Sequence, residues 1–241
     1  MPLLPLALRT QIAPANLALW HTLALQALWC GLAGLAALAL GGSPRERLGL
    51  TRVRLAAAPL LACVLATLAL SGALSFALEQ FALRSQGSLA RLDAIAAAAA
   101  PHSPWLTLVA FGIAPGIGEE LLFRGFLQRA LAPRLGAWCI VAAAAAFGLL
   151  HQDLVHSPAA FALGCTLGAV AWLARSTWAA VLCHVANNCA ATLQQLGAAA
   201  AFPHPESWLD ACLWLAASGL ALAFVARASL RRDDPTSNSS G

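Results

Sequence analysis

Long apolar stretches recur along the whole chain and are separated by short segments that contain proline, glycine or arginine. A transmembrane helix needs about 20 mostly apolar residues to cross the hydrocarbon core of a bilayer. We expect membrane spans near Leu17–Leu40, Leu55–Leu83, Pro104–Leu131, Ala137–His151, Pro158–Ala174, Trp178–Leu196 and Trp208–Ala228. The pattern predicts an all-α, polytopic transmembrane helical bundle with about seven spans.

The segment 84–103 is the weak point of this span count. It contains Arg84, Arg91 and Asp93, followed by the alanine run Ala96–Ala100, which favours helix. We expect an interfacial helix here, and the alternative is an eighth span. Residues 231–241 are polar, and we expect this tail to be disordered.

Composition narrows the classes of protein that the chain can represent. Hydrophobic residues make up 60% and charged residues only 10%, with a mean hydropathy of +0.75, which excludes an ordinary soluble domain. The net charge of +4 is small and dispersed, so we expect no nucleic-acid partner. Most arginines fall on one predicted side, which favours an outside N-terminus by the positive-inside rule. The heavy use of alanine, leucine and arginine suggests a bacterial inner (plasma) membrane.

Ionisable residues inside an apolar span are the first candidates for function. Glu119, Glu120 and Arg124 lie in the otherwise apolar stretch Pro104–Leu131, where each costs a few kcal/mol by insertion scales. Glu120 and Arg124 are four residues apart and can pair on one helix face. Such a pair could serve packing alone, but it leaves Glu119 unexplained, because Glu119 is rotated by about 100° and can face the bundle interior.

Pro115 lies just before the two glutamates. A proline removes a helical hydrogen bond, so it is expected to kink or restart the helix. The glutamates would then lie near a new helical N-terminus, where the dipole favours negative charge.

Two further polar pairs occur within spans: Phe147 with His151, and His184 with Asn188, each four residues apart. Alone, a histidine in a span is often an interhelical hydrogen-bonding group. Together with Glu119 they supply the parts needed to hydrolyse an amide bond: a desolvated carboxylate as base, and N–H donors for an oxyanion.

Other polar residues receive simpler interpretations. Cys183 adjoins His184, but neighbours on a helix diverge by about 100°, which gives little support for a covalent nucleophile. We expect Gln152, Asp153 and His156 to be solvated loop residues that could line an entrance.

The three pairs resemble the signature motifs of the CAAX-protease and bacteriocin-processing family, which comprises glutamate-type intramembrane endopeptidases. The motifs read Glu119-Glu120-x-x-x-Arg124, Phe147-x-x-x-His151 and His184-x-x-x-Asn188, in the family's order and spacing. The resemblance covers residues 104–197. The predicted parts are N-terminal helices and connector (1–103), the catalytic-like core (104–197), a C-terminal helix (198–230) and the tail (231–241).

The resemblance implies a role for each motif residue. Glu119 would be the general base that activates water, assisted by His151, while His184 and Asn188 would form the oxyanion site. Glu120 and Arg124 would shape the site and hold its helix. No cofactor is needed in this mechanism, which we favour. In the zinc-dependent alternative, Glu119, His151 and His184 would bind the metal, although no HExxH motif is present.

The expected partners are the lipid bilayer and a membrane-anchored protein or peptide substrate, such as a bacteriocin leader or a hydrophobic sorting tail. No residue selects between these substrates. A non-catalytic membrane scaffold or immunity factor is the alternative from another class. A transporter is disfavoured because the sequence has no inverted repeat and its intramembrane charges form one cluster.

Overall fold

The computed structural model describes residues 6–197 and 205–232. These residues form helices joined by turns, so the predicted all-α bundle is confirmed for the described part of the chain. Residues 198–204, at the start of the predicted C-terminal segment, and residues 233–241 of the predicted tail lie outside the described residues.

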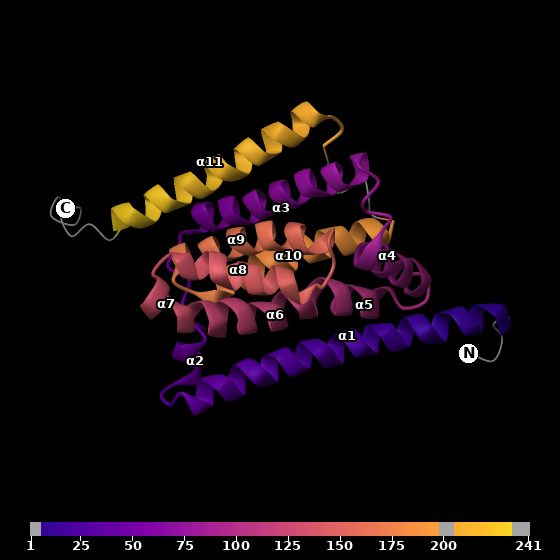
Figure 1. The fold of residues 1–241 in the computed structure, drawn as a ribbon, viewed down its shortest axis with the longest axis horizontal. Coiled ribbons are helices and arrows are strands. Elements are labelled where there is room, and N and C mark those ends of the chain that lie inside the picture. The colour runs from indigo at the N-terminus through magenta and orange to yellow at the C-terminus, as the bar shows by residue number, and fades with distance from the viewer. Residues whose placement is uncertain (1–5, 198–204, 233–241) are drawn as a thin grey trace.

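The bundle has three layers of helices (Figure 1). The helix α1 (Leu6–Ala39) lies along one side, and α3 (Ala57–Gln80) with α11 (Trp208–Arg232) covers the other. Between them lie α6 (Ala114–Glu120), α8 (Trp138–Leu150), α9 (His156–Ala174) and α10 (Thr177–Gln195). The short helices α2 (Pro44–Arg47) and α4 (Gly87–Ala99) connect the layers at opposite ends. The central layer therefore holds all three sequence motifs.

Five helical segments of the described chain are long and apolar enough to cross a membrane: Pro14–Ala39, Ala57–Gln80, Pro104–Leu135, His156–Ala174 and Trp208–Ser229. They establish a multi-pass membrane protein. The other two expected spans, Ala137–His151 and Trp178–Leu196, are not among these five segments. Helix α8 is apolar but has only 13 residues, and α10 carries His184 and Asn188. Both lie inside the bundle, where neighbouring helices supply partners for polar groups.

The connector forms α4, a 13-residue helix, rather than an eighth span. At 1.5 Å per residue such a helix is about 20 Å long, shorter than the hydrocarbon core of about 30 Å. Its buried Ala96 and Ala99 pack within the bundle. The alanine run therefore packs against the bundle. The structure shows a short helix in this connector, and its position at the membrane interface stays a prediction.

The run Pro104–Leu135 corrects one expectation about the glutamates. It is continuous: α5 (Pro104–Thr107), a π-helix (Leu108–Ile113), α6, a second π-helix (Leu121–Gln128) and α7 (Arg129–Leu135). Pro115 lies in the first turn of α6, directly after the wider π turns, and a proline is tolerated in a first turn. The helix is not restarted, so Glu119 and Glu120 lie at the end of α6 and not near a new N-terminus.

Glycines let two helices approach α6 closely. A Cβ on Gly116 would lie 2.8 Å from the backbone nitrogen of Val185 on α10. A Cβ on Gly118 would lie 2.8 Å from the backbone oxygen of Gln26 on α1. Real Cβ atoms do not approach backbone this closely, so both contacts require glycine. The result is that α6, with its two glutamates, lies between α1 and α10.

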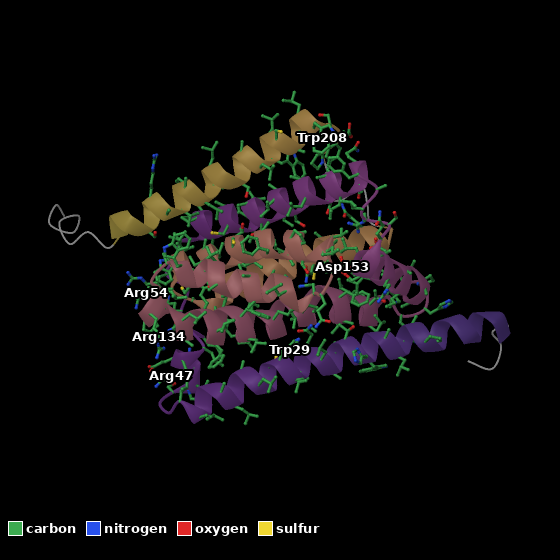
Figure 2. All side chains as sticks on the ribbon, in the orientation of Figure 1. Trp29, Arg47, Arg54, Arg134, Asp153 and Trp208 are labelled. Atoms are coloured by element: carbon green, nitrogen blue, oxygen red, sulfur yellow. The ribbon has the colours of Figure 1, made fainter. Side chains whose placement is uncertain are left out.

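The two ends of the bundle differ in charge. Figure 2 shows Arg47, Arg54 and Arg134 at one end, and Asp153 with Trp208 at the other. Loops at the arginine end are joined by hydrogen bonds such as Thr177 N to Gly49 O at 2.9 Å. Arginines gathered at one end are what the positive-inside rule expects of a cytoplasmic face. The orientation with an outside N-terminus stays a prediction.

Candidate active site

The carboxylate of Glu120 joins two helices at the centre of the bundle. It is fully buried, and its Oε1 accepts hydrogen bonds from Arg124 Nη1 and from His184 Nδ1, each at 2.8 Å. The predicted pairing of Glu120 with Arg124 is therefore present. Because a carboxylate only accepts, Nδ1 of His184 must carry the proton of this bond. The bond fixes the His184 ring and directs its other nitrogen, Nε2, away from Glu120.

Nε2 of His184 faces the second carboxylate. It lies 3.9 Å from Glu119 Oε2, which is too long for a hydrogen bond but a distance that one bridging water can span. The side chain of Glu119 keeps 13% of its surface exposed, whereas that of Glu120 has none. Glu119 is thus the partly accessible carboxylate of the pair, and the neighbouring imidazole is held in place by Glu120.

Arg124 also anchors the site to α8 and α9. Its Nη2 donates to the backbone oxygen of Gly164 at 3.0 Å, and its guanidinium carbon lies 4.7 Å from the centre of the Phe147 ring. One turn later, Gln128 Nε2 repeats the contact with the backbone oxygen of Gly168, also at 3.0 Å. A Cβ on Gly164 would lie only 3.2 Å from Arg124 Nη2, so glycine allows the arginine to reach the helix backbone.

Phe147 is the aromatic centre of the cluster. Its ring makes edge contacts with Phe123, His151 and His184 at centroid distances of 5.2, 5.1 and 6.0 Å. The backbone oxygen of Phe147 lies 3.0 Å from His151 Nδ1. A carbonyl only accepts, so Nδ1 of His151 donates here and its Nε2 is the nitrogen left for chemistry.

The turn that carries His151 is more ordered than the sequence suggested. The ring of His156 lies 4.1 Å from that of His151, and its Nδ1 is 3.0 Å from Ser88 Oγ. Asp153 accepts hydrogen bonds from the backbone nitrogens of Ser88, Val155 and His156 at 2.7, 2.9 and 2.8 Å.

These bonds from backbone nitrogens favour the ionised form and lower the pKa of Asp153 to about 2. Asp153 lies in the loop and is partly exposed, as expected, whereas His156 begins α9 and is not a loop residue. Both contact Ser88 and so tie the turn between α8 and α9 to α4. Gln152 is exposed, as expected.

Asn188 lies one turn beyond His184 on α10. Its Oδ1 accepts a hydrogen bond from Asn187 Nδ2 at 3.2 Å, which leaves its amide nitrogen as the group that can donate to another oxygen. The contacts described above gather Glu119, Glu120, Arg124, His151 and His184. None of these contacts includes Asn188, which lies one turn after His184 on α10 and is hydrogen-bonded to Asn187.

Gln26 on α1 is a site residue that the sequence reasoning missed. It is 6% exposed, and its Nε2 donates to Glu119 Oε1 at 3.1 Å. The signal was present in the sequence, because Gln26 is an amide inside an apolar span. No motif pointed to it, and its partner lies 93 residues away.

A zinc site requires three side chains whose ligand atoms converge on one ion. Among residues 6–197 and 205–232, no group of three or more histidine, cysteine, aspartate or glutamate side chains is arranged to hold a metal ion. The alternative ligand set Glu119, His151 and His184 therefore finds no support in the geometry.

A cavity of about 780 Å³ lies on another face of α10, between α3 and α11. Its walls are mostly apolar, with Ala66 and Gly72 from α3, Ala191 from α10 and Trp214 from α11. Asn187 also lines it. The Asn187–Asn188 hydrogen bond therefore connects the wall of this cavity to the predicted oxyanion residue.

Fold and site together define a multi-pass helical membrane protein with a buried cluster of carboxylates and imidazoles, which makes the cluster a candidate for function. Residues 101–190 match the family model described as type II CAAX prenyl endopeptidase Rce1-like, so this segment of the chain is similar to that family. The match contains all three motifs and supports a protease of the CAAX type. Searches of curated proteins and of solved structures gave no match.

Proposed function

We propose that the protein is an intramembrane endopeptidase that hydrolyses a peptide bond of a membrane-associated protein or peptide, using a water molecule activated by Glu119. The observation that carries this proposal is the chain of contacts Arg124–Glu120–His184–Glu119. It holds an imidazole nitrogen 3.9 Å from the partly accessible carboxylate of the pair. If the Glu120–Arg124 ion pair served only to stabilise the fold, neither Glu119 nor His184 would be required beside it.

The charges of the cluster suggest how a proton is held during the reaction. Two ionised carboxylates, Glu119 and Glu120, and one guanidinium, Arg124, leave one net negative charge while the imidazoles are neutral. A proton taken from water by Glu119 moves the negative charge from Glu119 to the hydroxide, while Glu120 and Arg124 stay a neutral pair. The hydroxide attacks the peptide carbonyl carbon, and the same proton then passes to the leaving amine as the C–N bond breaks.

The negative charge on the former carbonyl oxygen needs donors. The Asn188 amide is one candidate, and His184 Nε2 is the other when His184 carries a second proton, because Nδ1 stays bonded to Glu120. His151 keeps Nε2 available to hold the water beside Glu119, because its Nδ1 is bonded to Phe147. These assignments follow the roles that the family resemblance implies.

The cavity between α3, α10 and α11 suggests where the apolar part of a substrate binds. Its walls suit a hydrophobic segment, and Asn187 links it to Asn188 of the site. We infer that an apolar segment of the substrate occupies this cavity while its scissile bond lies near Glu119. A bacterial plasma membrane, suggested by composition, is the expected location.

The test replaces Glu119 with glutamine, which keeps size and hydrogen bonding but removes the base. Purified wild-type and Glu119→Gln proteins are reconstituted in liposomes with solubilised bacterial membrane proteins, and new peptide termini are identified by mass spectrometry. We expect cleavage to fall by about 10²–10⁴-fold. Glu46→Gln is the matched control, since Glu46 is an exposed glutamate of α2 that does not line the cavity between α3, α10 and α11. Cleavage that persists in Glu119→Gln would favour the non-catalytic scaffold.

A further inference from the structure

The contact between Gln26 and Glu119 comes from outside the segment that matches the family. Gln26 lies on α1, whereas the match begins at residue 101. Its amide nitrogen donates to Glu119 Oε1 at 3.1 Å, and the other oxygen of that carboxylate, Oε2, faces His184 Nε2. One oxygen of Glu119 is therefore held from α1 while the second faces the imidazole on α10.

The orientation of the Gln26 amide follows from its surroundings. An ionised carboxylate only accepts hydrogen bonds, so the amide nitrogen must face Glu119. The amide oxygen then faces Gly118, where an added Cβ would lie 2.5 Å from it. This oxygen is buried and has no hydrogen-bond partner among residues 6–197 and 205–232. The close approach of α1 that Gly118 permits is thus what brings the amide within reach of Glu119.

A glutamine that served only to pack α1 on α6 would be a poor choice. A buried acceptor without a partner carries a desolvation cost, and an apolar side chain of the same length would avoid it. In this protein the desolvation cost of the amide oxygen occurs together with the hydrogen bond from the amide nitrogen to Glu119, the proposed base. This juxtaposition indicates a role in the site rather than in the fold.

We propose that Gln26 is a positioning residue: it fixes Glu119 Oε1 so that Oε2 stays directed at the water between Glu119 and His184. The inference rests on the proposed function of Glu119. It assigns to α1 a part in the site that none of the three motifs contains. Gln26 acts through Glu119, so it should affect turnover and leave substrate binding unchanged.

The test is Gln26→Met, which keeps the length of the side chain and removes the amide. We expect kcat to fall by roughly tenfold to a hundredfold, as when a reacting group is displaced by about 1 Å, with KM unchanged. The melting temperature in detergent should stay the same or rise, because the unpartnered oxygen is gone. Thr22→Val is the matched control. Thr22 lies one turn earlier on α1, and its hydroxyl donates to the backbone oxygen of Ala18 in the same helix at 3.0 Å.

A second variant reaches the same contact from the other side. Gly118→Ala places a Cβ against Gln26 and moves α1 away from α6, so it should lower kcat as Gln26→Met does. The double variant should be no worse than the poorer single variant, because both remove one hydrogen bond.

Unchanged kcat in Gln26→Met, or a melting temperature that falls together with kcat, would overturn the positioning role. Glu119→Gln separates the two proposals. If Glu119→Gln is inactive while Gln26→Met has normal turnover, only the present inference fails. If Glu119→Gln is active, the proposed function fails.

Discussion

Replacing Arg124 with methionine tests the energetics of the buried cluster. The substitution keeps an unbranched side chain but leaves Glu120 without its guanidinium partner at 2.8 Å. It also removes the hydrogen bond to the backbone oxygen of Gly164 and the contact with the Phe147 ring. Both members of the ion pair are fully buried, so solvent cannot take the place of the lost charge.

The expected loss of stability is large. Removing one partner of a buried ion pair costs about 3–5 kcal/mol, because the remaining charge is left uncompensated. Each kcal/mol corresponds to roughly 2–4 °C in a domain of 150–250 residues. Arg124→Met should therefore lower the melting temperature by roughly 10 °C. In the double variant Glu120→Gln/Arg124→Met both charges are absent, and the introduced amide can still accept from His184, so much of this loss should be recovered.

The assay is thermal unfolding in detergent, followed by tryptophan fluorescence. Arg84→Met is the matched control, because Arg84 bonds Asp93 at 3.2 Å with about a third of its side chain exposed. Exposed ion pairs contribute about 0–1 kcal/mol, so this control should melt within a few degrees of the wild type. An Arg124→Met protein that melts like Arg84→Met, or a double variant that is no better than Arg124→Met, would refute the argument.

Two further predictions concern the turn and the cavity. The folded-state pKa of Asp153 is about 2, below its ordinary 3.8, so its ionised form stabilises the fold above pH 4 and this contribution is lost as the pH falls towards 2. The melting temperature of Asp153→Asn should therefore be below that of the wild type at pH 6 and converge with it at acidic pH; a constant difference would contradict the assignment. Ala191→Trp narrows the apolar cavity and should raise KM several-fold with little change in kcat, measured on a cleaved substrate peptide; an unchanged KM would exclude the cavity as the binding place.

Contacts within one helix could be predicted from sequence. The Glu120–Arg124 pair and the Phe147–His151 contact both join residues four apart, where helical geometry alone brings side chains together. The apolar pattern likewise predicted the helical bundle. It could not predict the π-helices around α6, because their wider turns leave no distinct periodicity in so short a stretch.

Contacts between helices depend on which helices become neighbours, and the sequence does not state this. Gln26 meets Glu119 only because α1 packs on Gly118, and Arg124 meets Gly164 only because α9 lies beside the second π-helix. His156 was interpreted as a loop residue because nothing local shows that Ser88 of α4 contacts it. A polar residue within an apolar span, such as Gln26 or Gln128, is nevertheless a signal that a partner exists on another helix.

The choice between a metal-free and a zinc-dependent site can be argued from the same contacts. Zinc ligands lie about 2.0–2.2 Å from the ion, so three ligand atoms must converge on one point. His184 and His151 use their Nδ1 atoms for Glu120 and for Phe147, which leaves Nε2 on each ring as the atom that could bind zinc. Metal-binding histidines also hold their second nitrogen in this way, so the argument depends on whether the ligand atoms converge. Within the described residues no such triple of ligands converges.

We therefore expect a chelator such as EDTA or 1,10-phenanthroline to leave cleavage unchanged after prolonged dialysis. The control is a zinc protease in the same liposomes, given the same chelator and dialysis. This control must lose its activity, because only then has the treatment removed zinc. Loss of cleavage by the present protein, restored by added zinc and absent in His151→Ala, would show that the ligands rearrange around a metal. Glu119 would then be a ligand rather than a free base, and the gap of 3.9 Å between Glu119 Oε2 and His184 Nε2 would be the place of the ion instead of the water.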